Sequence, residues 1–252
     1  MAWDTITKAL TSGPSTINMD EGSHKVILIG PDPTNREEHL PSIVTKAITA
    51  LLYEKDTEEQ WRNTHRLYRT LHADAKTRAG SGWLLEPPFH ALCVRGVTFV
   101  LSRMEIRPGG RINDIFTNTT SDIQENLILP PQMRVVYHKM NLIERLDANH
   151  YYEPVHGSQP SFDSFVYDPI GRRFNAFQVT TTAKHDMILK GFNSLRDLAL
   201  RLGLGPTTIR IVLVVPQGHT VVAPMSMTRD PSFEMWSLEV SEDQLWDENN
   251  IR

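Results

Sequence analysis

The sequence predicts an α/β fold for the greater part of the chain, and three neighbouring patterns lead to this prediction. Residues 160–180 have the alternation and the central turn of a β-hairpin, and residues 184–202 carry apolar side chains at helical spacing. Residues 209–215 form an unbroken apolar run, which is typical of a strand buried on both faces. A hairpin, a helix and a buried strand that follow an earlier helix and strand are typical of the α/β class.

The hairpin at residues 160–180 has a turn whose chemistry favours chain reversal. Pro169 fixes its own φ, and Gly171 is free to adopt a positive φ. We expect Tyr167 to pair with Arg172 across this turn. The turn thereby sets which side chains of the two strands lie beside each other.

One carboxylate and two neutral oxygen donors lie near the open end of the hairpin. In the expected register, Asp163 on the first strand is diagonal to Gln178 on the second, within roughly 7–8 Å. Thr180 shares the face of Gln178, because alternate side chains of a strand point the same way. An acid in an apolar strand is costly to bury unless it is paired or bound to a metal. These three side chains therefore predict a site for a hard cation such as Mg²⁺.

The remainder of the C-terminal part is predicted to hold further strands and one long excursion. Strands are expected at residues 97–104, 133–138 and 149–155, and the excursion at residues 106–132, which are rich in Gly, Asn, Thr and Pro. The helix at 184–202 is expected to end at Gly203.

The N-terminal part is predicted to be a small helical segment that covers residues 1–74. It contains a short strand at residues 25–29, followed by helices at residues 36–53 and 57–73. Residues 75–252 are then expected to form the α/β domain.

The composition is that of an ordinary soluble globular protein. The chain has 252 residues, of which 40% are hydrophobic, and it is long enough to bury a substantial core. Its single cysteine, Cys93, excludes a disulfide framework and is predicted to be a core residue. The first residues lack the apolar run of a signal peptide, and no segment approaches the ~20 apolar residues that span a bilayer. We therefore expect an intracellular protein, in the nucleus or the cytoplasm.

Charge is unevenly distributed along the chain. The formal net charge of −4 argues against a nucleic-acid partner. The run from Arg172 to Arg210, however, contains seven basic residues and only two acidic ones. Two interpretations stay open: a basic patch that binds DNA beside the candidate site, or an ordinary solvated helix face.

Three blocks of sequence, taken in order, resemble a known family. The first is residues 79–92, and the second is the strand that carries Asp163, followed by Phe177-Gln178-Val179-Thr180 and by His185. The third is the apolar strand at residues 209–216. Together they resemble the nuclease-like domain of Crinkler effectors and of related retrotransposon-hot-spot-type proteins, over roughly residues 75 to 240.

The resemblance implies a PD-(D/E)XK, or restriction-endonuclease-like, fold, in which a mixed central sheet is flanked by helices. It implies hydrolysis of phosphodiester bonds in DNA with the help of Mg²⁺, inside cells and often in a nucleus. In such a site Asp163 would bind the metal, with Glu86 and Gln178 completing the shell. Gln178 stands in place of the usual acid, and its carbonyl can ligate a cation without adding charge.

Two positions of the site depart from the pattern of active nucleases. Thr180 stands where the family has its lysine, and Lys184 or His185 could take over by assisting the water or the phosphate. Glu86 precedes two prolines, so we expect the helix that carries it to break or restart there.

These departures leave a second function open, a catalytically inactive module that keeps the fold and binds a protein or a nucleic acid. Single residues also have simpler interpretations. Thr180 suits a strand by its β-propensity, Lys184 suits a solvated surface, and His185 suits a helix start or a surface. Gln178 could simply bond a neighbouring backbone group. A small-molecule enzyme on the same layout has no motif behind it.

The family places its nuclease domain after an NTPase module. The chain has no Gly-x-x-x-x-Gly-Lys-Ser/Thr stretch, so that module is not encoded here. Two interpretations follow: residues 1–74 are a remnant after such a module in a longer protein, or the chain is a short family member.

Overall fold

The computed structural model of the protein describes most of the chain from residue 58 onward and two short strands before it. The described residues are 27–31, 39–43, 58–73, 78–107, 114–118, 122–155, 161–184, 189–225 and 232–247. The chain forms two compact units, Met1–Pro88 with Trp246–Arg252, and Phe89–Leu245. Among the helices within these described ranges, none combines the length and apolar character needed to cross a bilayer.

The first unit contains a two-stranded antiparallel sheet and a helix. The sheet pairs β1 (Ile27–Pro31) with β2 (His39–Ile43), and the helix is α3 (Glu58–Ala73). The helix predicted at 57–73 is thus confirmed. The helix predicted at 36–53 is wrong over residues 39–43, and the rest of it lies outside the described residues. Pro41 explains the difference, because a proline disfavours the α conformation of the residue before it.

Helix α4 (Arg78–Arg95) runs through both prolines, and the division between the two units falls within it. The predicted break after Glu86 is therefore wrong. Pro87 and Pro88 lack the N–H groups that would bond to the carbonyls one turn earlier, which makes this helix costly. Leu85 and Phe89 on either side are almost fully buried, so packing outweighs the intrinsic preference.

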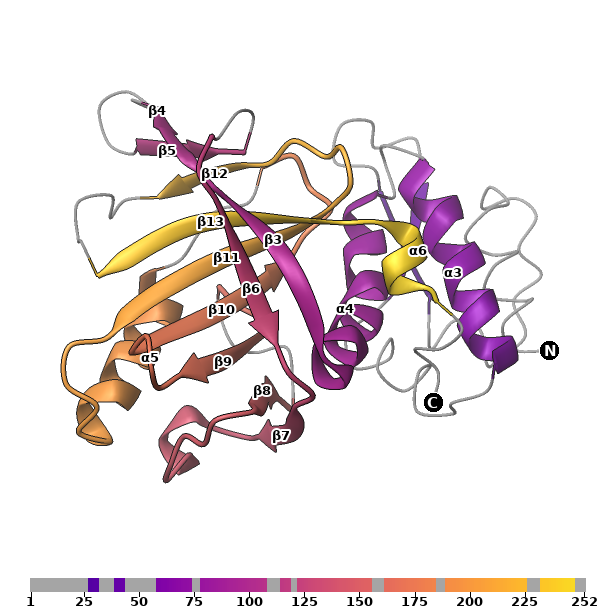
Figure 1. The fold of residues 1–252 in the computed structure, drawn as a ribbon. Helices are drawn as coiled ribbons and strands as arrows, with labels where there is room; N and C mark the ends of the chain where they lie inside the picture. Colours follow the sequence, from indigo (N-terminus) through magenta and orange to yellow (C-terminus); the bar gives the residue numbers. More distant parts are fainter. Residues whose placement is uncertain are drawn as a thin grey trace. The chain divides into compact units, whose positions relative to one another are not determined.

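The second unit is built on an eight-stranded mixed sheet, which confirms the α/β class (Figure 1). The strand order is β6-β3-β13-β11-β10-β9-β8-β7. Strands β10, β11 and β13 are parallel, as are β7 and β8, and the other neighbours are antiparallel. The bounds of these strands are β3 Val97–Arg103, β6 Gln124–Leu129, β7 Met133–Tyr137, β8 His150–Pro154, β9 Ser164–Asp168, β10 Arg173–Val179, β11 Thr208–Pro216 and β13 Phe233–Val240.

Several predicted elements are confirmed in this unit. Strands β3, β7, β8 and β11 and the β9–β10 hairpin lie where the sequence places them. Helix α5 (Leu189–Arg201) confirms the helix predicted at 184–202 over residues 189–201, whereas Lys184 lies before it in an isolated bridge. It ends as expected, since Gly203 adopts a φ of 66° just beyond it.

The excursion predicted at residues 106–132 is wrong, because much of it is strand. It contains β5 (Asp114–Thr117) and β6, and β4 (Glu105–Arg107) overlaps its start. Strands β12 (Val222–Met225), β5 and β4 form a separate three-stranded sheet. In β6 the side chains of Leu127 and Leu129 are buried while Ile128 is exposed, an alternation that the polar neighbours obscure in the sequence.

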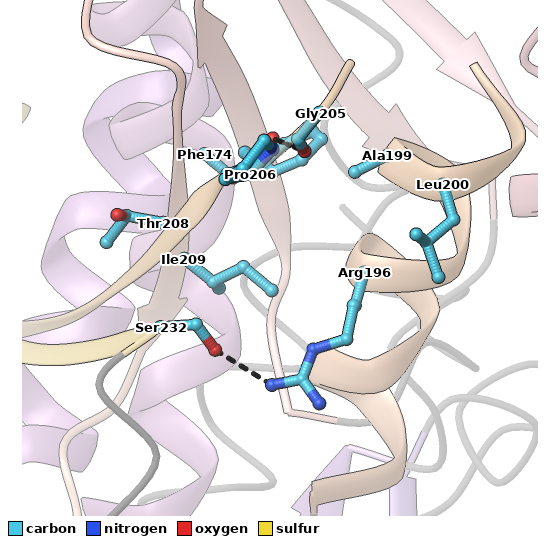
Figure 2. Close-up of a pocket in the computed structure, with 10 residues that line it drawn as sticks. Phe174, Arg196, Ala199, Leu200, Gly205, Pro206, Thr208, Ile209 and Ser232 are labelled. Carbon is cyan, nitrogen blue, oxygen red and sulfur yellow. Dashed lines mark hydrogen bonds between the residues drawn. The ribbon is translucent and has the colours of Figure 1, made fainter. Parts of the chain in front are cut away.

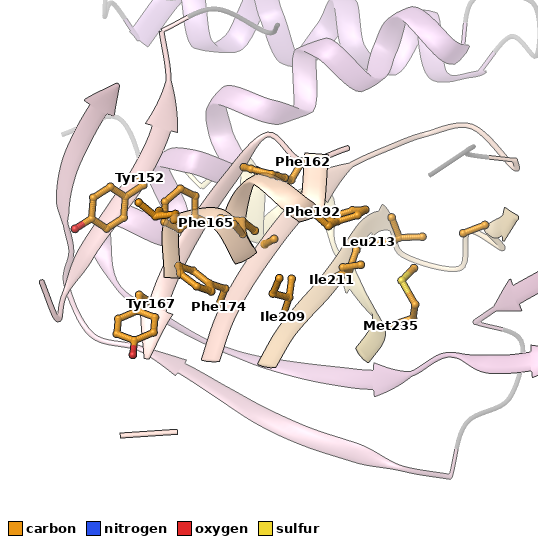
Figure 3. Close-up of a cluster of buried hydrophobic side chains, with 14 of the residues drawn as sticks. Tyr152, Phe162, Phe165, Tyr167, Phe174, Phe192, Ile209, Ile211, Leu213 and Met235 are labelled. Carbon is orange, nitrogen blue, oxygen red and sulfur yellow. The ribbon is translucent and has the colours of Figure 1, made fainter. Parts of the chain in front are cut away.

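One face of the large sheet packs against α5 through a continuous apolar core (Figure 3). From the helix, Phe192 and Leu195 contribute, and from the strands Phe165, Phe174 and Ile211. The remaining members of this buried cluster are Met104, Phe116, Tyr137, Ile143, Tyr152, Phe162, Tyr167, Ala176, Leu198, Ala199, Ile209, Leu213, Val215, Val221, Ala223 and Met235. Gln178 has the strand parity of Phe174 and Ala176, so it belongs to this helix-covered face.

Two short helical elements complete the described fold. They are the 3₁₀ helix η3 (Met140–Leu142), which follows β7, and the one-turn helix α6 (Glu242–Leu245), which follows β13. The predicted core role of Cys93 is confirmed, since it is buried and unpaired with any other cysteine.

Candidate functional site

The β9–β10 hairpin has a register that differs by two residues from the predicted one. Tyr167 pairs with Phe174, not with Arg172. The turn keeps four residues but is displaced by one along the chain, because Asp168 pairs with Arg173 and residues 169–172 form the loop. The Asp168 carboxylate stabilises this loop by accepting hydrogen bonds from the N–H groups of Ile170 and Gly171, both at 3.0 Å. A shift of two residues leaves every side chain on its predicted face.

The positive φ of this turn falls on Arg172, at 47°, and not on Gly171 as predicted. Gly171 has a different role. A Cβ at this position would collide with the carboxylate oxygen of Asp168. Gly171 therefore allows the close approach of the Asp168 side chain that sets the turn.

The corrected register brings Asp163 and Gln178 into direct contact. Asp163 lies immediately before β9 and is buried, and its backbone N–H donates to the carbonyl of Phe177 at 2.7 Å. Its Oδ2 accepts two hydrogen bonds at 2.8 Å, from Nε2 of Gln178 and from the backbone N–H of Val179. One buried carboxylate is thus stabilised by two N–H donors at the end of β10.

Gln178 holds its side-chain amide in a fixed orientation. Nε2 donates to Asp163 and also, at 3.2 Å, to the carbonyl of Val179. The nitrogen of the amide therefore faces the carboxylate. A half-turn of the same amide would present Oε1 instead, at the cost of these two hydrogen bonds and with little change in shape.

Thr180 follows β10 and continues the ladder, because its N–H donates to the carbonyl of Val214 at 2.9 Å. Its hydroxyl is hydrogen-bonded to the Thr182 hydroxyl at 2.9 Å and accepts the Thr182 N–H at 3.2 Å. Thr180 is buried, and these bonds turn the chain at the end of the strand.

Lys184 is exposed and lies in an isolated parallel bridge with Val222. It precedes α5 and is not part of the described helix. His185 lies outside the described residues.

Glu86 is a buried acid on α4 and belongs to the first unit, whereas Asp163 and Gln178 belong to the second. The structure brings Asp163 and Gln178 together.

A buried polar cluster on the opposite face of the sheet was not predicted. The Tyr151 hydroxyl is hydrogen-bonded to Nδ1 of His90 at 2.7 Å and to Oγ of Ser164 at 2.5 Å. Burial raises the pKa of both Tyr151 and the neighbouring Cys93 well above their ordinary values, so both stay protonated. Ser164 adjoins Asp163 on the chain and therefore points to the other face, which separates this cluster from the Asp163–Gln178 pair.

Most arginines of the run from Arg172 to Arg210 are used inside the fold. Arg210 is 1% exposed and donates to both carboxylate oxygens of Glu125, at 2.7 and 3.0 Å. It also lies 3.4 Å from Glu234, and its guanidinium carbon lies 4.5 Å from the centre of the Trp236 ring. The bond from Arg210 lowers the pKa of Glu125.

The contacts of three further arginines account for more of the run. Arg173 pairs with Glu125 and Asp168, both at 3.5 Å. Arg201 donates to the carbonyls of two residues near η3, and Arg196 donates to Ser232 at 2.8 Å. A DNA-binding surface at this run would thus have to rely on fewer free charges than the sequence count suggests.

A pocket of about 410 Å³ lies beside Arg196, between α5 and the start of β11 (Figure 2). Phe174 and Ile209 line it, and both stand at the beginnings of their strands. Gln178 is four residues further along β10, roughly 13 Å away. The pocket is therefore separate from the Asp163–Gln178 pair.

A cation would find one charged and one neutral ligand at this pair. Within the described ranges, no group of three or more His, Cys, Asp or Glu side chains lies close enough together to hold a metal. Mg²⁺ commonly binds through one or two carboxylates and takes water and substrate phosphate for the rest. Asp163 and Gln178 fit that minimal set once the amide of Gln178 turns its oxygen toward the carboxylate.

The geometry defines an α/β protein with a buried Asp–Gln pair at the junction of two central strands. Comparison of the chain with protein-family models, with curated proteins and with solved structures found no match.

Proposed function

We propose that the protein is a metal-dependent, nuclease-like effector that acts on DNA by phosphodiester hydrolysis, with a restriction-endonuclease-like fold of the Crinkler type. The observation that carries the proposal is the 2.8 Å contact between Asp163 and Gln178. It places the side-chain amide of Gln178 beside the acid, and a half-turn of that amide would present its oxygen to a cation. The resemblance implies a metal site at these two positions.

The order of elements supports the fold part of the proposal. Helix α4, strand β8, the β9–β10 hairpin, α5 and β11 occur in this order along the chain, with strands β3 to β7 and η3 between α4 and β8. The resemblance implies the same order, with an early helix that supplies a glutamate and a central hairpin that supplies the rest. Glu86 lies on that early helix.

Asp163 and Gln178 would hold the metal, and Glu86 would complete the shell directly or through water. When bound, such an ion would neutralise charge on the phosphate and lower the pKa of the attacking water. Asp163 supplies the negative charge that attracts the cation, and the buried surroundings strengthen that attraction. Lys184 or His185 would orient the water or the phosphate in place of the lysine that Thr180 replaces.

The proposed partner is DNA, and the proposed location is the nucleus or the cytoplasm. Lys184 and Arg172 are exposed basic residues in the run from Arg172 to Arg210 and would contact phosphates. Because phosphate contacts release counterions, binding through them weakens steeply as salt increases.

Cleavage of plasmid DNA tests this proposal. Purified protein is incubated with supercoiled plasmid and Mg²⁺ or Mn²⁺, with and without a chelator, and the products are separated on a gel. We expect nicked or linear DNA that chelator abolishes and that Asp163→Ala abolishes. Asp197→Ala, which removes an exposed acid from α5, is the matched control and should cleave normally. Cleavage that persists in Asp163→Ala would refute the assigned role.

A second function is favoured by a specific observation, an inactive module that keeps the fold and binds a protein or a nucleic acid. The Asp163 carboxylate already accepts two N–H donors, and Thr180 uses its hydroxyl to turn the chain. In the same assay this module would leave the plasmid uncleaved at any metal concentration. It would either bind DNA without cutting it, or bind a protein and no nucleic acid.

A further inference from the structure

Tyr137, on the edge strand β7, lies in the same row of the sheet as the Asp163–Gln178 pair. Tyr137 pairs with Pro154 in the register of β7 and β8. When the antiparallel register of β8 and β9 is continued by two residues beyond its last pair, Pro154 lies opposite Asp163. The same continuation of the hairpin places Asp163 opposite Gln178. Residues that are paired across a sheet point to the same face, so Tyr137, Asp163 and Gln178 share one face.

The hydroxyl of Tyr137 is buried without a hydrogen-bond partner among the described residues. The side chain is only 6% exposed, and its ring packs against Phe165 with 6.0 Å between the ring centres. The ring is therefore packed in the apolar core, and the hydroxyl itself is buried. Because an unsatisfied buried hydroxyl is costly, such a group in a native protein calls for an explanation.

The hydroxyl also stays protonated. Burial raises the pKa of Tyr137 far above its ordinary value, and the negative charges of Glu153 and Asp163 raise it further. A neutral phenol is a hydrogen-bond donor, whereas Asp163 is an acceptor. The row therefore offers a donor on β7 and an acceptor beside β9, with strand β8 between them.

We propose that Tyr137 is the third polar group of the Asp163–Gln178 site, and that its hydroxyl donates a hydrogen bond to a phosphate oxygen of bound nucleic acid. This inference rests on the proposed function, since it takes its ligand from there. A phosphate oxygen beside a carboxylate needs a donor to offset the repulsion between the two negative groups, and Tyr137 supplies one without adding charge. The fold leaves the hydroxyl unpaired because its partner arrives with the ligand.

The variant Tyr137→Phe tests the inference with two independent readouts. In the free protein, removal of an unsatisfied hydroxyl should raise the urea midpoint of unfolding. Affinity for a short DNA duplex, measured by fluorescence anisotropy with Ca²⁺ in place of Mg²⁺, should fall about 10-fold. Affinity for Mn²⁺ alone should be unchanged, because the hydroxyl is not a metal ligand.

Tyr152→Phe is the matched control, since it makes the same change in a buried tyrosine of β8. The Tyr152 hydroxyl accepts the N–H of Asp147 at 3.0 Å and donates to the carbonyl of Arg145 at 3.5 Å. Its loss should lower the urea midpoint and leave DNA affinity unchanged.

The possible failures are separable. A lower urea midpoint in Tyr137→Phe would show that the hydroxyl has a partner within the chain and would overturn the inference, as would unchanged DNA affinity beside a wild-type protein that binds. A wild-type protein that binds no nucleic acid would instead overturn the proposed function, together with the phosphate ligand assigned to Tyr137.

Discussion

At the scale of single residues, Asp163 is held by the end of the neighbouring strand. The two hydrogen bonds to its Oδ2 come from a side-chain amide and a backbone N–H, and both donors are buried. Loss of the carboxylate would remove the acceptor of both donors. A buried donor without an acceptor destabilises the fold by more than a satisfied hydrogen bond stabilises it. The residue therefore has a structural role as well as the proposed chemical one.

Two variants separate these roles. Asp163→Ala should lower the free energy of unfolding by about 1–3 kcal/mol, because Gln178 and Val179 lose their acceptor. Asp163→Asn keeps an acceptor oxygen and should cost less than about 1 kcal/mol, yet it should abolish Mn²⁺ binding because the charge is gone. Urea denaturation gives the first quantity, and calorimetric titration with Mn²⁺ gives the second. Full Mn²⁺ affinity in Asp163→Asn would contradict the metal role.

A buried arginine gives a pH dependence at the same scale. Hydrogen bonding to Arg210 lowers the pKa of Glu125 from its ordinary value of 4.5. A carboxyl group with a lowered folded-state pKa adds stability above its unfolded pKa, and this contribution is lost as pH falls through the folded value. Glu125→Gln should therefore lower the urea midpoint at pH 7 and flatten the loss of stability below about pH 4.5.

The control for that measurement is Glu144→Gln, which changes an exposed glutamate in the same unit. It should leave both the midpoint and the acid dependence as they are. An acid dependence that is the same in Glu125→Gln and in the wild type would show that the Glu125–Arg210 pair does not contribute to the pH dependence of stability.

At the scale of elements, helix α4 has a sequence that conflicts with its helical conformation. It is continuous through two interior prolines, each of which removes a backbone donor and crowds the preceding turn. The helix persists because its apolar side chains are buried on both sides of the prolines. Because packing holds this helix against its intrinsic propensity, replacing one of its prolines by a better helix former should stabilise the protein.

Pro87→Ala should raise the free energy of unfolding by about 1 kcal/mol or more, since it restores a backbone donor in the middle of α4. Pro169→Ala, in the hairpin turn, should lower it by about 0.5–1 kcal/mol, because there the proline restricts only the unfolded chain. Chemical denaturation of both variants compares the two effects. A loss of stability in Pro87→Ala would show that the turn after Glu86 needs the proline geometry.

The elements also show which parts of the fold the sequence could predict. The hairpin, α5 and β11 have strong local patterns and were predicted correctly. The helix predicted over residues 39–43 is wrong because Pro41 outweighs the apolar spacing, and the predicted hairpin register is wrong because the four-residue loop begins one residue later, after Asp168. Strands β5 and β6 were missed because their partners are remote in sequence and polar residues mask their alternation.

The candidate site was predictable only in part, for the same reason. The association of Asp163 with Gln178 followed from one hairpin, which is a local pairing. Tyr137 enters the row through β7 and β8, whose parallel pairing has no local signature in the sequence. The burial of Arg210 depends on Glu125, which belongs to a strand three places away in the sheet order.

At the scale of the whole molecule, the Glu125–Arg210 pair shows that the large sheet is strongly curled, because β6 must approach β11 across two intervening strands.

The sheet carries separate polar groups on its two faces. The Asp163–Gln178 pair and Tyr137 lie on the face that α5 covers, and the His90–Tyr151–Ser164 cluster lies on the other. This separation predicts that substitutions in the second cluster affect stability but not metal binding. Ser164→Ala should lower the free energy of unfolding, measured by urea denaturation, by about 1 kcal/mol. It should leave the affinity for Mn²⁺, measured by calorimetric titration, unchanged.

Anomalous diffraction from crystals soaked in Mn²⁺ tests the metal site most directly. We expect one peak about 2 Å from a carboxylate oxygen of Asp163 and from Oε1 of Gln178, with the amide turned and the bond from Nε2 to Oδ2 gone. An intact bond between Gln178 and Asp163, with no anomalous peak at the carboxylate in fully soaked crystals, would contradict the proposed site.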